Sequence, residues 1–330
     1  MRSHHKMMIS REPLRPFRFK VSQKTFTVGN VVFGGEPGER PVVLVGSIFY
    51  LGDKLVINHE EGVFDKKKAK EEIKYAEEVA EKHSLPLAID LIAYSEKAME
   101  NYVPFIVEIT EAPIFLDGVG EKARIAAYKT AYEIGITDRV IGNAIYTHSK
   151  DYELNALREY RIKNVVLMAF DAANPMKSMM PKDRLEILEK QLIPKAKKAQ
   201  VEHALVDVVV LDPASIAISA ASVLKIKNET GLPVGCAPAN ALGSVTKTAF
   251  GIEGMGGIHG GTSVFLQMFG ADFIFYGPMR RIKYVAPAVA VADAYLAYLA
   301  KFEGKEPPKN HPFNTLLRKL QRMFTGIEVW

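Results

Sequence analysis

Hydrophobic residues in this chain fall in short bursts that are separated by amphipathic stretches, and the pattern begins near residue 41. The first burst, residues 42–50, is apolar along its whole length and predicts a buried strand. Residues 65–83 follow with apolar positions three and four apart, which predicts a helix with one buried face. Asp65 is a suitable N-cap for this helix.

The same alternation repeats along the chain, and each later burst is rich in Val and Ile. Parallel strands that are buried on both faces have this composition. Eight consecutive strand–helix units favour a closed barrel over an open sheet, so we predict an α/β protein with a (β/α)8 TIM barrel. The predicted strands are residues 42–50, 87–92, 114–117, 139–143, 164–170, 205–211, 233–237 and 272–277.

Segments before and after the repeat have other patterns. Residues 17–34 alternate apolar and polar side chains around a Gly-Asn pair, which predicts an N-terminal β-hairpin that could cover the bottom of the barrel. The glycine-rich run 251–261 lacks the Gly-Lys-Ser/Thr ending of a phosphate loop and predicts a mobile loop at the barrel mouth. Pro194 is expected to break or bend the helix predicted for 182–200. The predicted units are 1–16 (extended or disordered), 17–40 (hairpin), 41–305 (barrel) and 306–330 (tail helix).

Composition and charge exclude several classes of protein. The net charge of +5 is spread along helices, which is typical of solvated helix faces and not of a nucleic-acid binding protein. The single cysteine, Cys236, excludes an internal disulfide framework. The basic N-terminal residues contain no apolar signal core, so we expect a cytoplasmic protein. A partner could still bring it to a membrane complex.

Polar residues stand at the ends of most predicted strands, where the active sites of α/β barrels lie. Asp207 is the most informative, because an ionised carboxylate inside an apolar strand must be paired or hydrogen-bonded. A structural role, such as capping backbone amides, is the favoured interpretation for Asp90 and Asp212. The residues at these positions are Ser47, Asp90, Asp117, Asn143, Asp171, Asp207, Asp212 and Asn240.

The chemistry of this set indicates a ligand with several N–H groups. Carboxylates accept paired N–H donors in charge-assisted bonds, and an Asn side chain both donates and accepts. The 2-amino-4-oxo edge of a pterin presents that mixture, whereas a phosphate would require Lys or Arg. His148 and His259 show no metal-ligand spacing, and Cys236 is expected to be a small buried residue. We therefore expect no metal.

Several longer stretches of the chain, taken together, resemble the H subunit of tetrahydromethanopterin S-methyltransferase. More distantly, the chain is similar to the methyltetrahydrofolate:corrinoid protein methyltransferases. The resemblance runs from about residue 20 to residue 312. Its stretches are VVFGGEPGERPVVLVGSIFY, EAPIFLDGVGEKARI, DRVIGNAIY, VVLMAFDAANP, ALVDVVV, LPVGCAPANA, GADFIFYGP and NHPFN.

The resemblance implies a barrel that binds a reduced methyl-pterin at its mouth and exchanges the methyl group with a corrinoid. Asp117 in FLDG, Asn143 in IGNA and Asp207 in LVDV match pterin-contacting positions. Asn240 in APAN matches an Asn beside the N5 nitrogen that carries the methyl group, and is the implied catalytic residue. Asp212 is an alternative to Asp207. Ser47 and Asp171 are further candidates for pterin contact.

The resemblance also implies partners. A corrinoid (cobalamin) would be carried by a separate protein or subunit, within a complex that could be membrane-bound, and a homodimer is expected by analogy. The segment CAPAN and the run 251–261 depart from the methanogen pattern, so tetrahydromethanopterin and tetrahydrofolate both remain candidates. Two alternatives are an enzyme of dihydropteroate synthase type, for which Arg280–Arg281 is the only basic pair near a strand end, and a non-catalytic barrel subunit.

Overall fold

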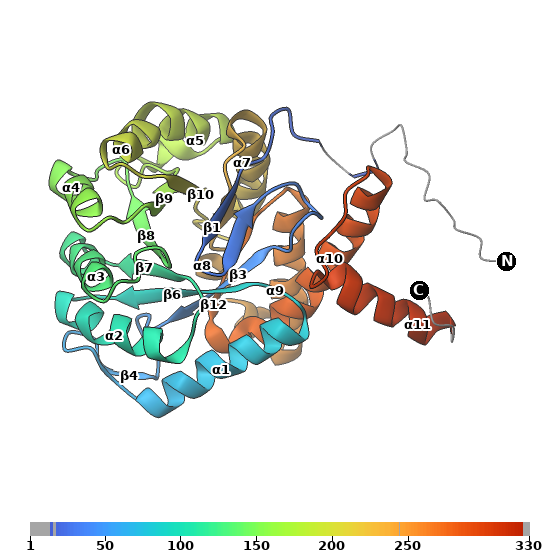
Figure 1. Ribbon diagram of the computed structural model, residues 1–330, viewed down its shortest axis with the longest axis horizontal. Coiled ribbons are helices and arrows are strands. Elements are labelled where there is room, and N and C mark those ends of the chain that lie inside the picture. The colour runs from blue at the N-terminus through green and yellow to red at the C-terminus, as the bar shows by residue number, and fades with distance from the viewer. Residues whose placement is uncertain (1–13, 16–17, 244, 326–330) are drawn as a thin grey trace.

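The barrel predicted from the strand pattern is present in the computed structural model, which describes residues 14–15, 18–243 and 245–325. Eight parallel strands close in the order β10-β11-β12-β3-β6-β7-β8-β9, with helices around the outside (Figure 1). This confirms the (β/α)8 fold with an N-terminal hairpin. The barrel strands are β3 (Val43–Ile48), β6 (Leu87–Ala93), β7 (Ile114–Gly118), β8 (Val140–Ile145), β9 (Asn164–Met168), β10 (His203–Asp207), β11 (Val234–Cys236) and β12 (Phe273–Pro278).

Side-chain caps place several of the helices where the sequence predicts them. Asp65 accepts a hydrogen bond from the Lys68 amide at the start of α1, and Ser95 accepts one from Ala98 at the start of α2. The π-helical segment Leu188–Leu192 interrupts the regular helix just before Pro194, as expected. The helices are α1 (Lys66–Lys82), α2 (Glu96–Ile109), α3 (Glu121–Glu133), α4 (Asp151–Glu159), α5 (Pro181–Ile187), α6 (Ile193–Lys198), α7 (Ser215–Thr230), α8 (Ala239–Leu242), α9 (Val245–Met268), α10 (Ile282–Phe302) and α11 (Arg318–Thr325).

The N-terminal hairpin closes the bottom of the barrel. Strands β1 (Thr25–Val28) and β2 (Val31–Gly34) pair antiparallel across the Gly29–Asn30 turn. Phe33 is fully buried, and its ring meets Phe115 and Phe273 edge-on at centroid distances of 6.0 and 6.2 Å. The hairpin therefore contributes side chains to the barrel interior.

Alternation along the strands defines what faces the barrel axis. Successive side chains of a strand point to opposite sides, so every second residue is directed inward. The inward residues near the bottom form an apolar cluster with the hairpin. This cluster contains Val43, Val45, Ala88, Phe115, Ile141, Val166, Leu205, Phe273 and Phe275. It fills the lower barrel. The next inward positions, nearer the mouth, include several polar residues.

The region after β11 differs from the prediction. Residues 251–261, predicted as a mobile loop, lie in α9, which is kinked where Gly251 has φ 66°. Gly260 explains the closeness of α9 to α10, because a Cβ there would lie 3.0 Å from the Tyr284 carbonyl oxygen. Gly260 therefore serves helix packing, which the local sequence pattern does not reveal.

One helix, together with its preceding turn, is long and apolar enough to cross a membrane by length and composition alone. It spans Met279–Phe302 and includes α10. Half of its most apolar window is buried. Val285, Val289 and Leu296 are among its buried residues. The apolar face of this helix therefore packs on the barrel, as expected for the helix that follows the eighth strand.

Candidate functional site

A ring of polar side chains lies directly above the apolar lower barrel. Each member stands two residues after an inward apolar residue of the same strand, so each is directed toward the barrel axis. We call these five residues the polar ring: Ser47 on β3, Asp90 on β6, Asp117 on β7, Asn143 on β8 and Asp207 on β10. Because the strands are parallel and end at the same rim, the ring lies at the mouth end of the barrel.

Strand register brings neighbouring ring members together. Ser47 pairs with Asp90 across β3 and β6, and the Ser47 hydroxyl donates to Asp90 Oδ2 at 2.8 Å. Asp117 pairs with Asn143 across β7 and β8. Asp207 faces them from the other side of the barrel, close enough for its charge to raise the pKa values of both Asp90 and Asp117.

Burial makes the three carboxylates reluctant to ionise together. It raises the pKa of Asp117 to about 7; Arg124 partly opposes this rise and Asp207 adds to it. Burial also raises the pKa of Asp207 to about 6, although the hydrogen bond from the Val209 amide and the charge of Arg184 both lower it. The pKa of Asp90 is raised well above its ordinary value by burial and by Asp117. Carboxyl groups with raised pKa values in a barrel mouth are typical of a functional site.

Two buried ring atoms have no hydrogen-bond partner among the described residues. They are Asp90 Oδ1 and Asn143 Oδ1. Both residues are nearly inaccessible to solvent, and an unpaired buried oxygen costs about 1–3 kcal/mol. A ligand that presents N–H donors to these acceptors would recover that free energy.

A buried arginine holds the end of β10, where Asp207 stands. Arg184, on α5, is 1% exposed, and its guanidinium donates to the carbonyl oxygens of Ser178, Val208 and Val209. Val209 has φ 55°, a left-handed conformation that is strained for a β-branched residue. Its amide donates to Asp207 Oδ1 at 2.7 Å, so the strained turn fixes the carboxylate.

A second arginine, Arg124, partly opposes the rise in the pKa of Asp117 that burial causes. Arg124 donates to the Gly118 carbonyl and forms a buried ion pair with Glu153 at 2.5 Å. Its guanidinium lies 5.1 Å from the centroid of the Tyr146 ring. Arg124 is thus fixed by its own contacts and acts on the ring through its charge.

The remaining candidates lie outside the ring. Asn240 is exposed in the short helix α8, just beyond the end of β11 at the mouth. Asp171 accepts hydrogen bonds from the amides of Ala173 and Asn174 and closes its own turn. Asp212 is exposed and accepts from the Ser215 amide at the start of α7. Of the Asp207–Asp212 pair, Asp207 is the one that faces the barrel axis.

Sequence reasoning set Asp90 aside in favour of a structural role, yet it is the most enclosed carboxylate of the ring. The signal was available, because Asp90 stands two residues after Ala88 and so shares its inward direction. Arg184 was not identified, since nothing in its helix indicates contact with a strand end. Among the described residues, no cluster of three His, Cys, Asp or Glu could hold a metal.

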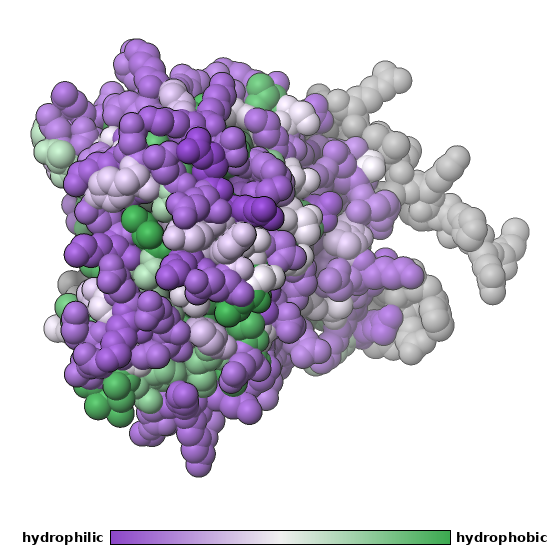
Figure 2. All heavy atoms as spheres, turned by 60° about the vertical axis from the view of Figure 1, so that its left-hand side comes forward, coloured by the Kyte–Doolittle hydropathy of each residue, from purple (hydrophilic) through white to green (hydrophobic). Residues whose placement is uncertain are grey.

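Apolar side chains surround the mouth on the segments that follow the strands. They are strongly exposed, unlike the barrel interior. We call them the apolar rim: Leu51, Ile57, Val119, Met176, Met180, Leu211, Phe250 and Ile252. Figure 2 shows that one face of the molecule is mainly hydrophilic, with apolar side chains gathered in small patches.

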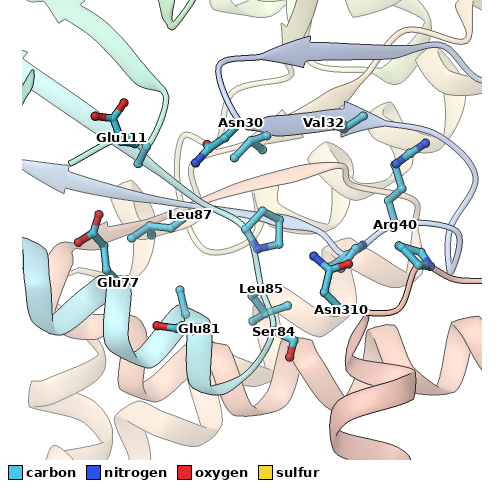
Figure 3. Close-up of a pocket in the computed structure, with 16 residues that line it drawn as sticks. Asn30, Val32, Arg40, Glu77, Glu81, Ser84, Leu85, Leu87, Glu111 and Asn310 are labelled. Carbon is cyan, nitrogen blue, oxygen red and sulfur yellow. The ribbon is translucent and has the colours of Figure 1, made fainter.

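A cavity of about 690 Å³ lies at the other end of the barrel, below the strands (Figure 3). This basal cavity is bounded by Asn30 and Val32 of the hairpin region and by Glu77, Glu81 and Glu111. Chemistry in α/β barrels occurs at the carboxyl ends of the strands, so the basal cavity does not compete with the polar ring as a catalytic site.

Comparison with known proteins places most of the chain in one family. A family model described as "Tetrahydromethanopterin S-methyltransferase MtrH subunit" matches residues 21–308. The H subunit of tetrahydromethanopterin S-methyltransferase from Methanothermobacter thermautotrophicus is 31% identical, over 91% of this chain and all of its own length. The H subunit from Methanopyrus kandleri is 31% identical over 88% of this chain and 97% of its own.

Solved structures with a similar fold include dihydropteroate synthases. The Yersinia pestis enzyme with a sulfonamide drug complex has a TM-score of 0.57 and 13% identity, covering 82% of this chain and 99% of that one. The Xanthomonas albilineans enzyme in complex with 7,8-dihydropteroate has a TM-score of 0.56 and 15% identity, covering 83% and 99%. At this identity the likeness establishes the barrel fold.

Proposed function

Since the chain belongs to the H-subunit family of tetrahydromethanopterin S-methyltransferase, whose members are methyltransferases, we propose that its polar ring binds a reduced methyl-pterin. The N5-methyl group is then exchanged with the cobalt of a corrinoid on a partner protein. The observation that carries this proposal is the convergence of three carboxyl groups and one amide, with two unpaired buried oxygens, on one barrel axis.

The ring and the pterin edge are complementary in hydrogen bonding. Asp117 and Asp207 accept N–H donors, and Asn143 offers both an acceptor and a donor to the amino and oxo groups. Ser47 and Asp90 complete the acceptor set from the neighbouring strands. Among the described residues of the ring there is no Lys or Arg, which favours a nitrogen-rich heterocycle over a phosphate.

A corrinoid on the partner would supply a nucleophilic cobalt as the acceptor of the methyl group. The bond between N5 and the methyl carbon would break, and N5 would keep its electron pair and take up a proton. In this chain, Asp117, Asn143 and Asp207 fix the ring so that the methyl group faces the mouth, which is a positioning effect. Asn240 stabilises the protonated N5 through its amide, an interaction that grows as the bond breaks.

The apolar rim supports a partner that docks over the mouth. Exposed Met, Leu, Ile and Phe side chains around a polar site are the composition of a protein-binding surface, and Met side chains adapt to a partner's shape. We propose that the corrinoid-carrying protein sits on this rim. Its complex with the chain would be the route to any membrane assembly, and Asp171 and Asp212 would shape the rim loops without contacting the pterin.

The test is a binding titration with methyl-tetrahydromethanopterin and methyl-tetrahydrofolate, followed by single-turnover transfer to a reduced corrinoid protein. Asp117→Ala should weaken pterin binding strongly, because it removes a charged acceptor worth about 1.5–3 kcal/mol. Asn240→Ala should slow the transfer step with a modest loss of affinity. Unchanged pterin affinity in Asp117→Ala would show that the site is misplaced.

Two controls separate this function from the alternatives. Asp212→Asn keeps the cap of α7 and should leave pterin affinity unchanged. Pterin binding without methyl transfer to any corrinoid protein would favour a non-catalytic subunit. Formation of dihydropteroate from a pterin pyrophosphate would favour the synthase type, which should use a cationic set. Here Arg280 pairs with Glu72 and Arg281 bonds the Gly243 carbonyl.

A further inference from the structure

The C-terminal helix carries an apolar stripe that is longer than the surface it packs on. Helix α11 continues directly from the π-helical turn Phe313–Leu317. Leu316 is half-buried against the core, whereas Leu320, Met323 and Phe324 on the same face are 42, 74 and 92% exposed. We call these three exposed residues the distal stripe. The helix therefore begins as a packed element and ends with its apolar face in solvent.

This helix leaves the body at the bottom of the barrel. The Thr315 hydroxyl lies 2.7 Å from that of Ser84, which precedes β6 and therefore belongs to the end opposite the mouth. Phe313 anchors the segment, with its ring stacked on Tyr298 at a centroid distance of 6.2 Å. Figure 1 shows α11 projecting away from the barrel. Anything bound there leaves the polar ring accessible.

All charged residues of α11 are basic. Arg318, Lys319 and Arg322 are its charged residues, and the helix contains no Asp or Glu. Residues 301–325 contain six Lys and Arg but only two Glu. Glu303 is bound by Arg15, whereas Lys301 pairs with Glu306 and Lys305 with Glu39, so the cations of α11 carry the charge argument. An apolar stripe flanked by cations is the pattern of helices that lie in a membrane interface.

We propose that α11 docks on an anionic lipid surface, with the distal stripe among the acyl chains and its cations on the headgroups. A second copy of the chain fits less well, because two α11 helices would bring like charges together. The segment lies beyond residues 21–308 that the family model matches. It does not depend on the function proposed for the mouth.

Neighbouring charges confine the contact to the helix. Glu77, Glu81 and Glu111 around the basal cavity face the same end of the molecule. Glu111 is paired with Arg139 and Glu77 with Lys74, so these two charges are partly neutralised. The remaining negative charge would hold the barrel away from an anionic surface. Binding should therefore be shallow and sensitive to salt.

The experiment is co-sedimentation of the full chain with vesicles of phosphatidylglycerol and phosphatidylcholine in equal amounts, and with vesicles of phosphatidylcholine alone. The wild type should bind the mixed vesicles, and this binding should weaken as salt rises. Phe324→Ser should weaken partitioning about tenfold, by loss of apolar burial. Arg322→Gln should weaken it about fivefold, by loss of one cation. Both residues are exposed, so the fold is expected to survive and circular dichroism will check it.

Matched control variants lie at the other end of the molecule. Leu51→Ser removes a similarly exposed apolar residue from the mouth, and Lys67→Gln removes a surface cation from α1; both should bind as the wild type does. The proposal is overturned if the wild type ignores anionic vesicles, or if both α11 variants bind normally. It is also overturned if sedimentation velocity shows a dimer that Phe324→Ser dissociates while lipid binding is absent, because the stripe would then belong to a second copy.

Discussion

Replacing Asp207 by Asn should stabilise the ligand-free protein at alkaline pH while it damages pterin binding. Asp207 is 5% exposed, and burial raises its pKa from 3.8 to about 6. A raised folded-state pKa means that the folded protein holds this proton more tightly than the unfolded chain does. The stability contribution is therefore complete below pH 4 and is lost as pH rises through 6.

The magnitude follows from the shift in pKa. A rise of about two units corresponds to about 3 kcal/mol, nearly all of which the wild type has lost by pH 8. Asn is neutral at every pH and keeps an oxygen that can accept from the Val209 amide. The difference in unfolding free energy between Asp207→Asn and wild type should therefore grow by about 2.5 kcal/mol between pH 4 and pH 8.

Urea unfolding followed by circular dichroism at both pH values measures this difference. Asp212→Asn is the matched control, because it changes an exposed carboxylate to an amide that caps a helix equally well. Parallel pH dependence of stability in Asp207→Asn and wild type would refute the reasoning, since it would mean that the buried carboxyl is not penalised. A gain in stability together with a loss of pterin affinity is the usual trade at a functional site.

Further predictions concern packing and positioning. Phe33→Ala should lower the unfolding free energy by about 3–5 kcal/mol, measured by urea titration, because it empties the barrel floor. Lys227→Met should cost about 3–5 kcal/mol in the same assay by leaving the Asp272 carboxylate buried without its partner, and Lys227→Met/Asp272→Leu should recover part of the loss. Arg184→Lys should weaken pterin binding about tenfold, because an ammonium cannot reach all the carbonyls that the guanidinium binds, and the pH profile of binding should shift with the pKa of Asp207.

The barrel could be predicted from the sequence because each of its strands is recognisable from the residues of that strand and its neighbours. All eight strands were expected at the right places, since each is a short apolar run between amphipathic helices. The residue at which β10 ends was not predicted correctly. The strand was predicted to continue to residue 211 but ends at Asp207, because Arg184 draws the next two carbonyl oxygens away from the ladder. That contact joins residues 24 apart, and no local pattern records it.

The site was predictable to the extent that alternation along the strands determines direction. Asp117, Asn143 and Asp207 were expected to converge, and all three face the barrel axis. Asn240 instead lies exposed at the rim, where its orientation toward a ligand depends on a short helix. The added hairpin β4–β5 (Val56–Asn58 and Val63–Phe64) between β3 and α1 was missed, because its strands are too short to show a period.

The floor formed by Phe33 has a kinetic consequence. Phe33, Phe115 and Phe273 pack across the lower barrel and close it beneath the polar ring, so a ligand of the ring would enter from the mouth. A pterin in the polar ring and a partner protein docked over the mouth would share this single route of entry, so the docked partner would block the pterin from entering or leaving. The pterin would therefore bind before the partner protein and dissociate after it, which is an ordered kinetic mechanism.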